Sequence, residues 1–218
     1  MALAIFDLDN TLLAGDSDYS WGQFLVQHKL VDPASYEQAN KKFFQDYQNG
    51  RLDIYEYSAF CFAPLSKYSM NELARFHAMF MDEFIRPMIT EQARELVARH
   101  RQQQDDLLVI TATNSFITRP IVRELGIETL LATEPRIVDG RYTTEINGIP
   151  CYKQGKVTRL EEWLARTGKS LAGSWFYTDS VNDLPLLELV DNPVAVDPDR
   201  ELARIAAQQG WPVISLRT

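Results

Sequence analysis

Short, continuous apolar runs recur along this chain, and segments with helical spacing separate them. The first run, residues 2–6, ends abruptly in acid, which is typical of a strand buried on both faces of a parallel sheet. Intervening segments with apolar residues three or four positions apart end at Gly126 and Gly168, as helices commonly do. This alternation predicts an α/β fold with a doubly wound parallel sheet, interrupted at residues 136–146 by an Asp-Gly pair that predicts a hairpin turn. The other apolar runs lie at residues 107–110, 130–132, 175–177 and 194–196.

Residues 17–86 have a different character. They are rich in Tyr, Phe, Gln and Lys and contain no clear buried strand. Aromatic residues recur at helical spacing, as at Trp21 and Phe24 and again at Phe76 and Phe80. We therefore expect a helical insertion whose aromatic residues form its own core. The predicted division is a core of residues 1–16 and 87–218 and a helical insertion of residues 17–86.

Composition limits the classes of partner. With 218 residues, 45% of them hydrophobic, the chain is long enough to bury a large core. Lys and Arg total 22 against 30 for Asp and Glu, so a net charge of -8 argues against nucleic acid as a partner. Cys61 and Cys151 lack metal-ligand spacing, the first residues lack a signal-peptide pattern, and no run has the length of a membrane span. We expect a reduced, cytoplasmic protein with no membrane association.

Four acidic residues follow predicted strands. Asp7 and Asp9 come directly after the first run, and Asp179 and Asp183 follow the run at 175–177. The carboxyl ends of parallel strands meet at one edge of the sheet, where ligands bind. A lone Asp-x-Asp pair is more often a solvated turn or a helix cap, but four carboxylates in one small volume would repel one another without a divalent cation. Oxygen-only ligands favour Mg²⁺ over Zn²⁺.

Two further residues could bind phosphate. Thr111 follows the second apolar run, before a helix expected to begin near Ser115, and a hydroxyl beside free N–H groups suits an anion, although an ordinary helix cap is the alternative. Lys156 follows Gly155 at the start of a later predicted helix, where an ammonium could neutralise a phosphate and a carboxylate. Most lone lysines are solvated, and Lys153 is a rival. The glycine and the helical register after it favour Lys156.

In their order along the chain, these residues resemble the four motifs of the haloacid dehalogenase superfamily of phosphatases. Each motif alone is weak evidence for the family. Together they span the whole chain in the right order, each at the right end of its predicted strand or helix, so a chance match is improbable. The helical insertion between the first two motifs resembles the cap of the phosphoserine-phosphatase-like branch. The resemblance implies a Rossmann-like core with an inserted α-helical cap, in a Mg²⁺-dependent phosphatase. The matching segments are Asp7-Leu-Asp9-Asn-Thr11, Thr111, Lys156 and Asp179-Ser-Val-Asn182-Asp183.

The resemblance also implies a role for each residue. Asp7 would attack the phosphorus and carry an aspartyl-phosphate, and Asp9 would protonate the leaving group and then activate water. Mg²⁺ would be held by Asp7, the main-chain carbonyl of Asp9, and Asp179. Asp183 would orient Lys156. The phosphate-binding residues implied are Thr111, Ala112, Lys156 and Asn182.

The substrate is less tightly constrained. Asp16 lies where the chain enters the insertion, and phosphoserine phosphatases carry an acid at the equivalent place to bind the substrate amine, although a charged surface residue is the alternative. They also use a cap arginine for the substrate carboxylate, but residues 52–62 contain none and Arg51 is several positions too early. An ester with an amine and no carboxylate, such as histidinol phosphate, fits better, with phosphoserine and phosphoethanolamine as alternatives. The patterns at residues 12–18 and 111–116 resemble family phosphatases that act in histidine synthesis.

Two interpretations in which the protein is not a phosphatase remain. A phosphorylated receiver domain also combines clustered acids, a Thr and a Lys on a doubly wound sheet, but receivers are much shorter and place the phosphorylated Asp on a later strand. A non-catalytic, phosphate-responsive regulatory protein would usually lack the nucleophile or a metal-binding acid, and here none is missing. The sequence does not indicate the oligomeric state.

Overall fold

A six-stranded parallel sheet forms the centre of the molecule in the computed structural model, which describes residues 2–49 and 51–217. The strand order is β3-β2-β1-β6-β7-β8, so β1 is central and its carboxyl end faces the middle of one sheet edge. The strands are β1 (Leu3–Phe6), β2 (Asp106–Asn114), β3 (Thr129–Thr133), β6 (Trp175–Thr178), β7 (Asn192–Val196) and β8 (Val213–Ile214).

Helices cover both faces of the sheet, and the alternation of side chains along β1 shows why. Ala4 and Phe6 pack into an apolar cluster that includes residues of α5 and α6. Leu3 and Ile5 point to the opposite face, into a second cluster with residues of α7, α8 and α9. This arrangement confirms the α/β, doubly wound prediction. The helices are α5 (Glu91–Gln102), α6 (Ser115–Glu124), α7 (Gln154–Thr167), α8 (Leu184–Leu187) and α9 (Arg200–Gln209).

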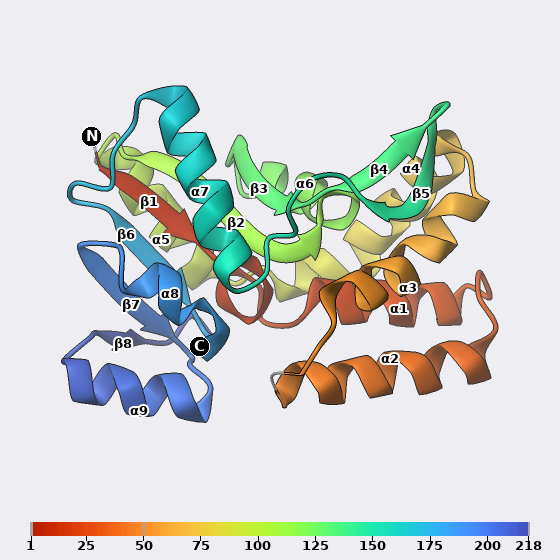
Figure 1. Cartoon of the computed structure of the whole chain (residues 1–218), viewed down its shortest axis with the longest axis horizontal. Coiled ribbons are helices and arrows are strands. Elements are labelled where there is room, and N and C mark those ends of the chain that lie inside the picture. The colour runs from red at the N-terminus through yellow and green to blue at the C-terminus, as the bar shows by residue number, and fades with distance from the viewer. Residues whose placement is uncertain (1, 50, 218) are drawn as a thin grey trace.

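Helices fill the region between the first two strands, as expected (Figure 1). Aspartate or serine side chains cap their N-termini: Asp16, Asp32, Asp53 and Ser69 each accept a main-chain N–H from the first turn. The helices are α1 (Ser17–Gln27), α2 (Pro33–Gln48), α3 (Ile54–Lys67) and α4 (Met70–Phe80), followed by the short turns η2 (Met81–Ile85) and η3 (Arg86–Met88).

The aromatic residues of this region do not form the separate core that their spacing predicted. Trp21 stacks on Phe24 (5.1 Å between ring centroids), but it also meets Phe116 of α6 at 5.3 Å. His77 of α4 contacts the main-chain oxygen of Ile117 through Nε2 at 2.9 Å. These aromatics therefore belong to the same apolar cluster as Phe6, because α1 and α4 pack directly against α6.

The chain enters and leaves the helical region through two segments that lie side by side. Leu13 and Ile89 form an antiparallel bridge, and the N–H of Ala14 donates to the carbonyl of Met88 at 2.8 Å. At both ends of the helical region the chain therefore runs through a short extended segment, and this bridge and this hydrogen bond join the two segments. The region is also joined to the rest of the molecule by the packing of α1 and α4 against α6.

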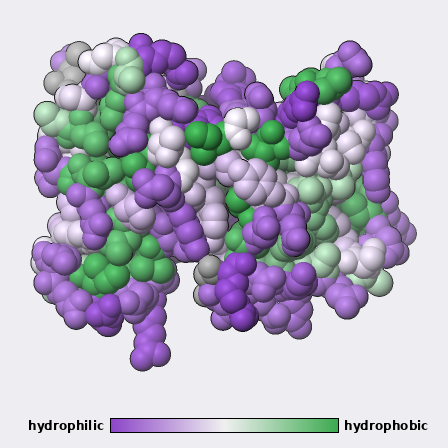
Figure 2. Space-filling view, viewed as in Figure 1, coloured by the Kyte–Doolittle hydropathy of each residue, from purple (hydrophilic) through white to green (hydrophobic). Residues whose placement is uncertain are grey.

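The predicted hairpin is present. β4 (Pro135–Val138) and β5 (Arg141–Ile146) pair antiparallel, and Asp139 and Gly140 both have positive φ, as a two-residue hairpin turn requires. Figure 1 shows the hairpin reaching away from the sheet toward α3 and α4, and β5 contacts α3. Ile137 and Val138 at its tip are exposed, and hydrophobic surface is visible there in Figure 2.

Two details differ from the sequence prediction. β2 does not end at Thr111 but continues to Asn114, because an irregularity in its pairing with β3 lets the strand extend past the run of Leu, Val and Ile. The two-residue β8 and the helix α9 were not anticipated. β8 is too short to give a periodic signal, whereas the apolar residues of α9 do recur at helical spacing. No helix among the described residues has the length and hydrophobicity needed to cross a membrane.

Candidate active site

The loop after β1 carries the first two acidic residues. The N–H of Asp7 donates to the carbonyl of Tyr177 (2.9 Å), so Asp7 is fixed by the last sheet hydrogen bond. Asn10 adopts a left-handed conformation (φ 54), which turns the chain sharply within η1 (Leu8–Leu12). Asp9 lies on this turn, where its carboxylate accepts the N–H of Ser17 at 2.6 Å and the hydroxyl of Thr113 at 2.8 Å. Asp9 is thus oriented by both the start of α1 and the end of β2.

Lys156 occupies the centre of the acidic cluster. Its Nζ donates to Asp7 Oδ1 at 2.9 Å and to Asp183 Oδ2 at 2.7 Å, and all three side chains are buried. Thr178 at the end of β6 adds a hydroxyl donor to Asp183 Oδ2 at 2.7 Å. One ammonium therefore bonds both Asp7 and Asp183, which fixes the orientation of both carboxylates.

Burial and charge shift the pKa values of this cluster. Desolvation raises the pKa of Asp7 to about 7, Lys156 opposes that rise, and Asp183 adds to it. Burial alone would lower the pKa of Lys156, but Asp183 and Asp7 outweigh it and hold that pKa above its usual value. The lysine therefore stays charged while Asp7 resists ionisation until a further positive charge arrives.

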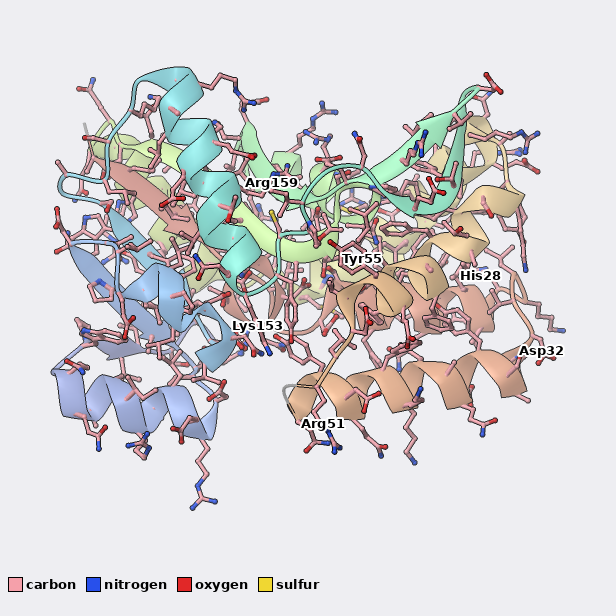
Figure 3. The ribbon with its side chains drawn as sticks, viewed as in Figure 1. His28, Asp32, Arg51, Tyr55, Lys153 and Arg159 are labelled. Carbon is pink, nitrogen blue, oxygen red and sulfur yellow. The ribbon has the colours of Figure 1, made fainter. Side chains whose placement is uncertain are left out.

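Gly155 explains why Lys156 reaches this position. A Cβ at residue 155 would lie 2.0 Å from the carbonyl oxygen of Pro150, so only glycine allows the chain to approach this closely at the start of α7. Lys153, the rival candidate, has φ 49 and places its Nζ over the ring of Tyr152 at 5.1 Å. Figure 3 shows Lys153 near the beginning of α7. Lys156, rather than Lys153, is the lysine in contact with Asp7.

Replacing Gly155 with alanine is expected to lower kcat by about 100-fold, because the backbone must shift and carry Lys156 away from Asp7. Phosphate release from p-nitrophenyl phosphate measures the effect. Gln154→Ala, an exposed change one residue earlier in the same helix, serves as the control. A Gly155→Ala enzyme as active as the control would show that the close approach to Pro150 does not position Lys156.

Asp179 completes the acidic edge. It directly follows β6, and its Oδ1 accepts the hydroxyl of Thr11 at 3.0 Å, while its own N–H donates to that hydroxyl oxygen at 3.1 Å. Burial raises the pKa of Asp179 well above its usual value, and the nearby charges of Asp7 and Asp183 raise it further. Two carboxylates held this close in a buried site need a counter-charge beyond Lys156.

The donor atoms available here suit a hard cation. The hydrogen bonds of the described residues engage only Oδ1 of Asp7 and Oδ1 of Asp179, which leaves one oxygen on each carboxylate. Across residues 2–49 and 51–217, no three His, Cys, Asp or Glu side chains are arranged to hold a metal. An ion at this edge would therefore take two carboxylates, a main-chain carbonyl and water, a set that fits Mg²⁺ better than Zn²⁺.

The candidate phosphate-binding residues lie in the same pocket. Thr111 is buried, and its Oγ1 accepts the N–H of Thr113 at 3.2 Å. The pocket is lined there by Thr111, Ala112 and Thr113, the late residues of β2, rather than by the start of α6 at Ser115 as expected. Asn182 also lines the pocket, and its Nδ2 donates to Ser180 at 3.3 Å.

The helical region supplies the other wall of the pocket. Asp16 lines it, and one of its oxygens caps α1 by accepting the N–H of Tyr19 at 2.9 Å. Arg51 is exposed and follows α2 at its end (Figure 3), and it does not line the pocket. Figure 2 shows a notch in the lower edge of the molecular surface, between the surface formed by α9 and the surface formed by α2. Other lining residues of this wall are Asn40, Phe43, Tyr47, Leu52, Ile54 and Tyr57.

Sequence reasoning missed several residues at this site. Thr113 and Thr178 each bond a carboxylate, and the signal was their position at the ends of two predicted strands. Asp18 is buried in the pocket wall, where Tyr57 donates to it at 2.7 Å. The available signal was its position three residues before Trp21, which places this acid on the apolar face of α1.

Comparisons with known proteins agree with the geometry. The model of the haloacid dehalogenase-like hydrolase family matches residues 4–188. The histidinol-phosphatase of Neisseria meningitidis serogroup C is 49% identical over 99% of both chains. Phosphoserine phosphatase SerB1 of Mycobacterium tuberculosis is 31% identical, over 99% of this chain and 71% of its own length.

Solved structures support the same assignment. A Bordetella pertussis Tohama I protein of unknown function superposes with a TM-score of 0.93 at 44% identity, covering 99% of this chain and 98% of its own. A substrate-bound phosphoserine phosphatase superposes with a TM-score of 0.71 at 17% identity, covering 99% and 93%, and shows that the fold is shared. The receiver-domain interpretation is therefore wrong. The chain belongs to the haloacid dehalogenase-like hydrolase family, within its metal-dependent phosphatases.

Proposed function

We propose that this phosphatase uses Mg²⁺ and hydrolyses histidinol phosphate through an aspartyl-phosphate on Asp7. The observation that carries the chemistry is the buried contact between Lys156 and Asp7, which aims one oxygen of Asp7 away from the lysine. Full-length similarity to a histidinol-phosphatase, at 49% identity, supports the substrate. The proposed localisation is cytoplasmic, with neither nucleic acid nor membrane as a partner.

The residues of the chain divide the work as follows. Asp7 attacks the phosphorus through one of its carboxylate oxygens. Lys156 and Thr111, with Ala112 and Asn182, hold the phosphoryl oxygens. Mg²⁺, bound by Asp7, Asp179 and the Asp9 carbonyl, would supply the positive charge that lets two anions approach. Asp183 fixes Lys156 in place.

Asp9 has the properties of a general acid and base. Burial raises its pKa to about 6, and the charge of Asp16 raises it further, while hydrogen bonds from Ser17 and Thr113 oppose the rise. A carboxyl with a pKa near neutrality holds a proton for the departing alkoxide and later accepts one from water. This prepares Asp9 for both half-reactions.

We propose further that residues 17–86 act as a cap over a core of residues 1–16 and 87–218. The paired connections at Leu13 and Ile89 allow such a motion, and closure would exclude water from the leaving group. Phosphoserine is the second candidate substrate, favoured by the 31% identity to SerB1. Against it, Lys156 is the only Lys, Arg or His among the described lining residues, which leaves a substrate carboxylate without a partner.

A phosphate-release assay with Mg²⁺, compared with an EDTA-treated sample, tests the proposed function. Histidinol phosphate is expected to give the highest kcat/KM among histidinol phosphate, phosphoserine and phosphoethanolamine, and EDTA is expected to abolish turnover. A higher kcat/KM for phosphoserine would contradict the proposed substrate. Full activity after metal removal would contradict the proposed cofactor.

Asp16→Asn is expected to lower kcat/KM for amine-bearing substrates about 30-fold or more relative to p-nitrophenyl phosphate. Asparagine still caps α1, so the change removes the charge and not the cap. A buried ammonium that loses its partner is strongly disfavoured. Equal losses for both kinds of ester would assign Asp16 a structural role only.

A further inference from the structure

The pocket is strongly acidic even after the proposed catalytic groups are accounted for. Six aspartates line it, and Lys156 is the only Lys, Arg or His among the described lining residues. Lys156 is already shared by Asp7 and Asp183, and the proposed Mg²⁺ would be held by Asp7 and Asp179. The remaining charge gathers at the start of α1, on the leaving-group side, where Asp16 and Asp18 lie two residues apart.

Asp18 has no part in the mechanism described above, yet it is 92% buried, with 8% of its surface exposed. Its Oδ2 accepts the hydroxyl of Tyr57 at 2.7 Å and lies 3.7 Å from Sγ of Cys61, both on α3. No ion pair to Asp18 is formed by the side chains of residues 2–49 and 51–217. Burying a carboxylate without a cation is costly, so this arrangement favours a positive group that is brought by a ligand.

The neighbouring wall is aromatic. Phe43, Tyr47 and Tyr57 come from α2 and α3, and Tyr152 comes from the loop before α7. The rings of Phe43 and Tyr57 lie 5.3 Å apart at 63°, and the buried hydroxyl of Tyr152 has no hydrogen-bond partner within the described structure. Flat apolar faces beside a carboxylate suit a flat, basic ring, which can stack on the rings while its N–H groups donate to the acid.

We propose that Asp18, held by Tyr57, is a specificity-determining residue that binds a basic heteroaromatic ring in the leaving group, while Asp16 binds the ammonium. The preferred substrate class is then a phosphate monoester whose leaving group carries two basic groups, an amine and an imidazole-like ring. This inference rests on the proposed function and deepens it. An imidazole donates an N–H to Asp18 whether it is neutral or protonated.

A purely structural role makes a different prediction. If Asp18 only ties α1 to α3 through Tyr57, its replacement weakens every substrate to the same degree and lowers the thermal stability. If it recognises the ring, the loss depends on whether the ring is present. Three esters separate these cases: histidinol phosphate carries the amine and the ring, phosphoethanolamine carries the amine alone, and p-nitrophenyl phosphate carries neither basic group.

The test measures kcat/KM with Mg²⁺ for Asp18→Asn and Tyr57→Phe on all three esters. Asp18→Asn is expected to reduce the ratio of histidinol phosphate to phosphoethanolamine by about 30-fold. Tyr57→Phe, which keeps the carboxylate, is expected to reduce that ratio less. Asp32→Asn makes the same chemical change at an exposed cap of α2 that does not line the pocket, and serves as the matched control.

The outcomes separate the two proposals. A wild-type enzyme that does not hydrolyse histidinol phosphate overturns the proposed function and this inference together. A wild-type enzyme that prefers histidinol phosphate, with an Asp18→Asn variant that leaves the substrate ratio unchanged, overturns only the role of Asp18. If Asp18→Asn does not fold, Tyr57→Phe decides: an equal loss on all three esters assigns the pair a structural role and overturns the inference.

Discussion

Phosphate release is expected to fall by about four orders of magnitude or more when Asp7 is replaced by asparagine. The amide keeps the shape of the side chain but is not a nucleophile, and it removes a negative charge from the proposed metal site. Lys156 retains its bond to Asp183, so the fold is expected to survive. Loss of activity with an unchanged circular-dichroism spectrum and melting temperature is the expected combination.

The covalent step can be examined directly. Beryllium fluoride, which mimics a phosphoryl group, should bind the wild-type enzyme at Asp7 and should not bind Asp7→Asn. Asp32→Asn, an exposed aspartate changed in the same way, is expected to keep full activity. Residual turnover within about tenfold of wild type, a barrier change of only about 1.4 kcal/mol, would contradict nucleophilic catalysis by Asp7. A phosphoryl mimic bound to Asp179 or to a Ser or Thr would do so as well.

Replacing Lys156 with methionine is expected to damage stability and activity together. The change leaves Asp7 and Asp183 buried side by side without the ammonium that bonds both. Removal of one partner from a buried charge pair costs about 3–5 kcal/mol of unfolding free energy. Loss of a group that stabilises the transferring phosphoryl oxygens is expected to lower kcat by about 100-fold or more.

Urea unfolding and steady-state kinetics measure the two effects on the same preparation. Lys153→Met is the matched control, because it makes the same change three residues earlier and is expected to cost no more than about 1 kcal/mol, from the loss of its contact with the Tyr152 ring. Lys156→Arg keeps the charge but replaces a compact ammonium with a planar fork, so we expect it to recover more stability than activity. A Lys153→Met variant that loses as much activity as Lys156→Met would reverse the choice between the two lysines.

Much of the architecture was predictable because it depends on local patterns. The apolar runs ending at Asp7 and before Asp179 identified buried strands, and their acids had to meet at one sheet edge once the strands were parallel. The Asp139-Gly140 pair predicted the hairpin, because both residue types accept the positive φ that a two-residue turn requires. Periodicity also located several of the helices, among them α1, α4, α5, α6 and α7, because an amphipathic pattern is a property of neighbouring residues.

Other features depended on contacts between distant parts of the chain. Lys156 and Asp7 are separated by 149 positions, and only the crossing of α7 over β1 brings them within 2.9 Å. The spacing of Trp21 and Phe24 correctly predicted a helix, but it did not predict that this helix packs against α6. Periodicity shows which face of a helix is apolar and not what that face packs against.

The sequence by itself determined the fold class and the order of the strand-end acids, and it favoured Lys156 over Lys153, because each follows from residue types and spacing within a few positions. Only the tertiary structure decided which acids are buried and what they face. Asp18 is an acid on the first turn of a helix, yet α3 packs over it and places Tyr57 against its carboxylate. The physical reason is that burial and hydrogen-bond partners are set by neighbouring elements, whose positions local sequence does not encode.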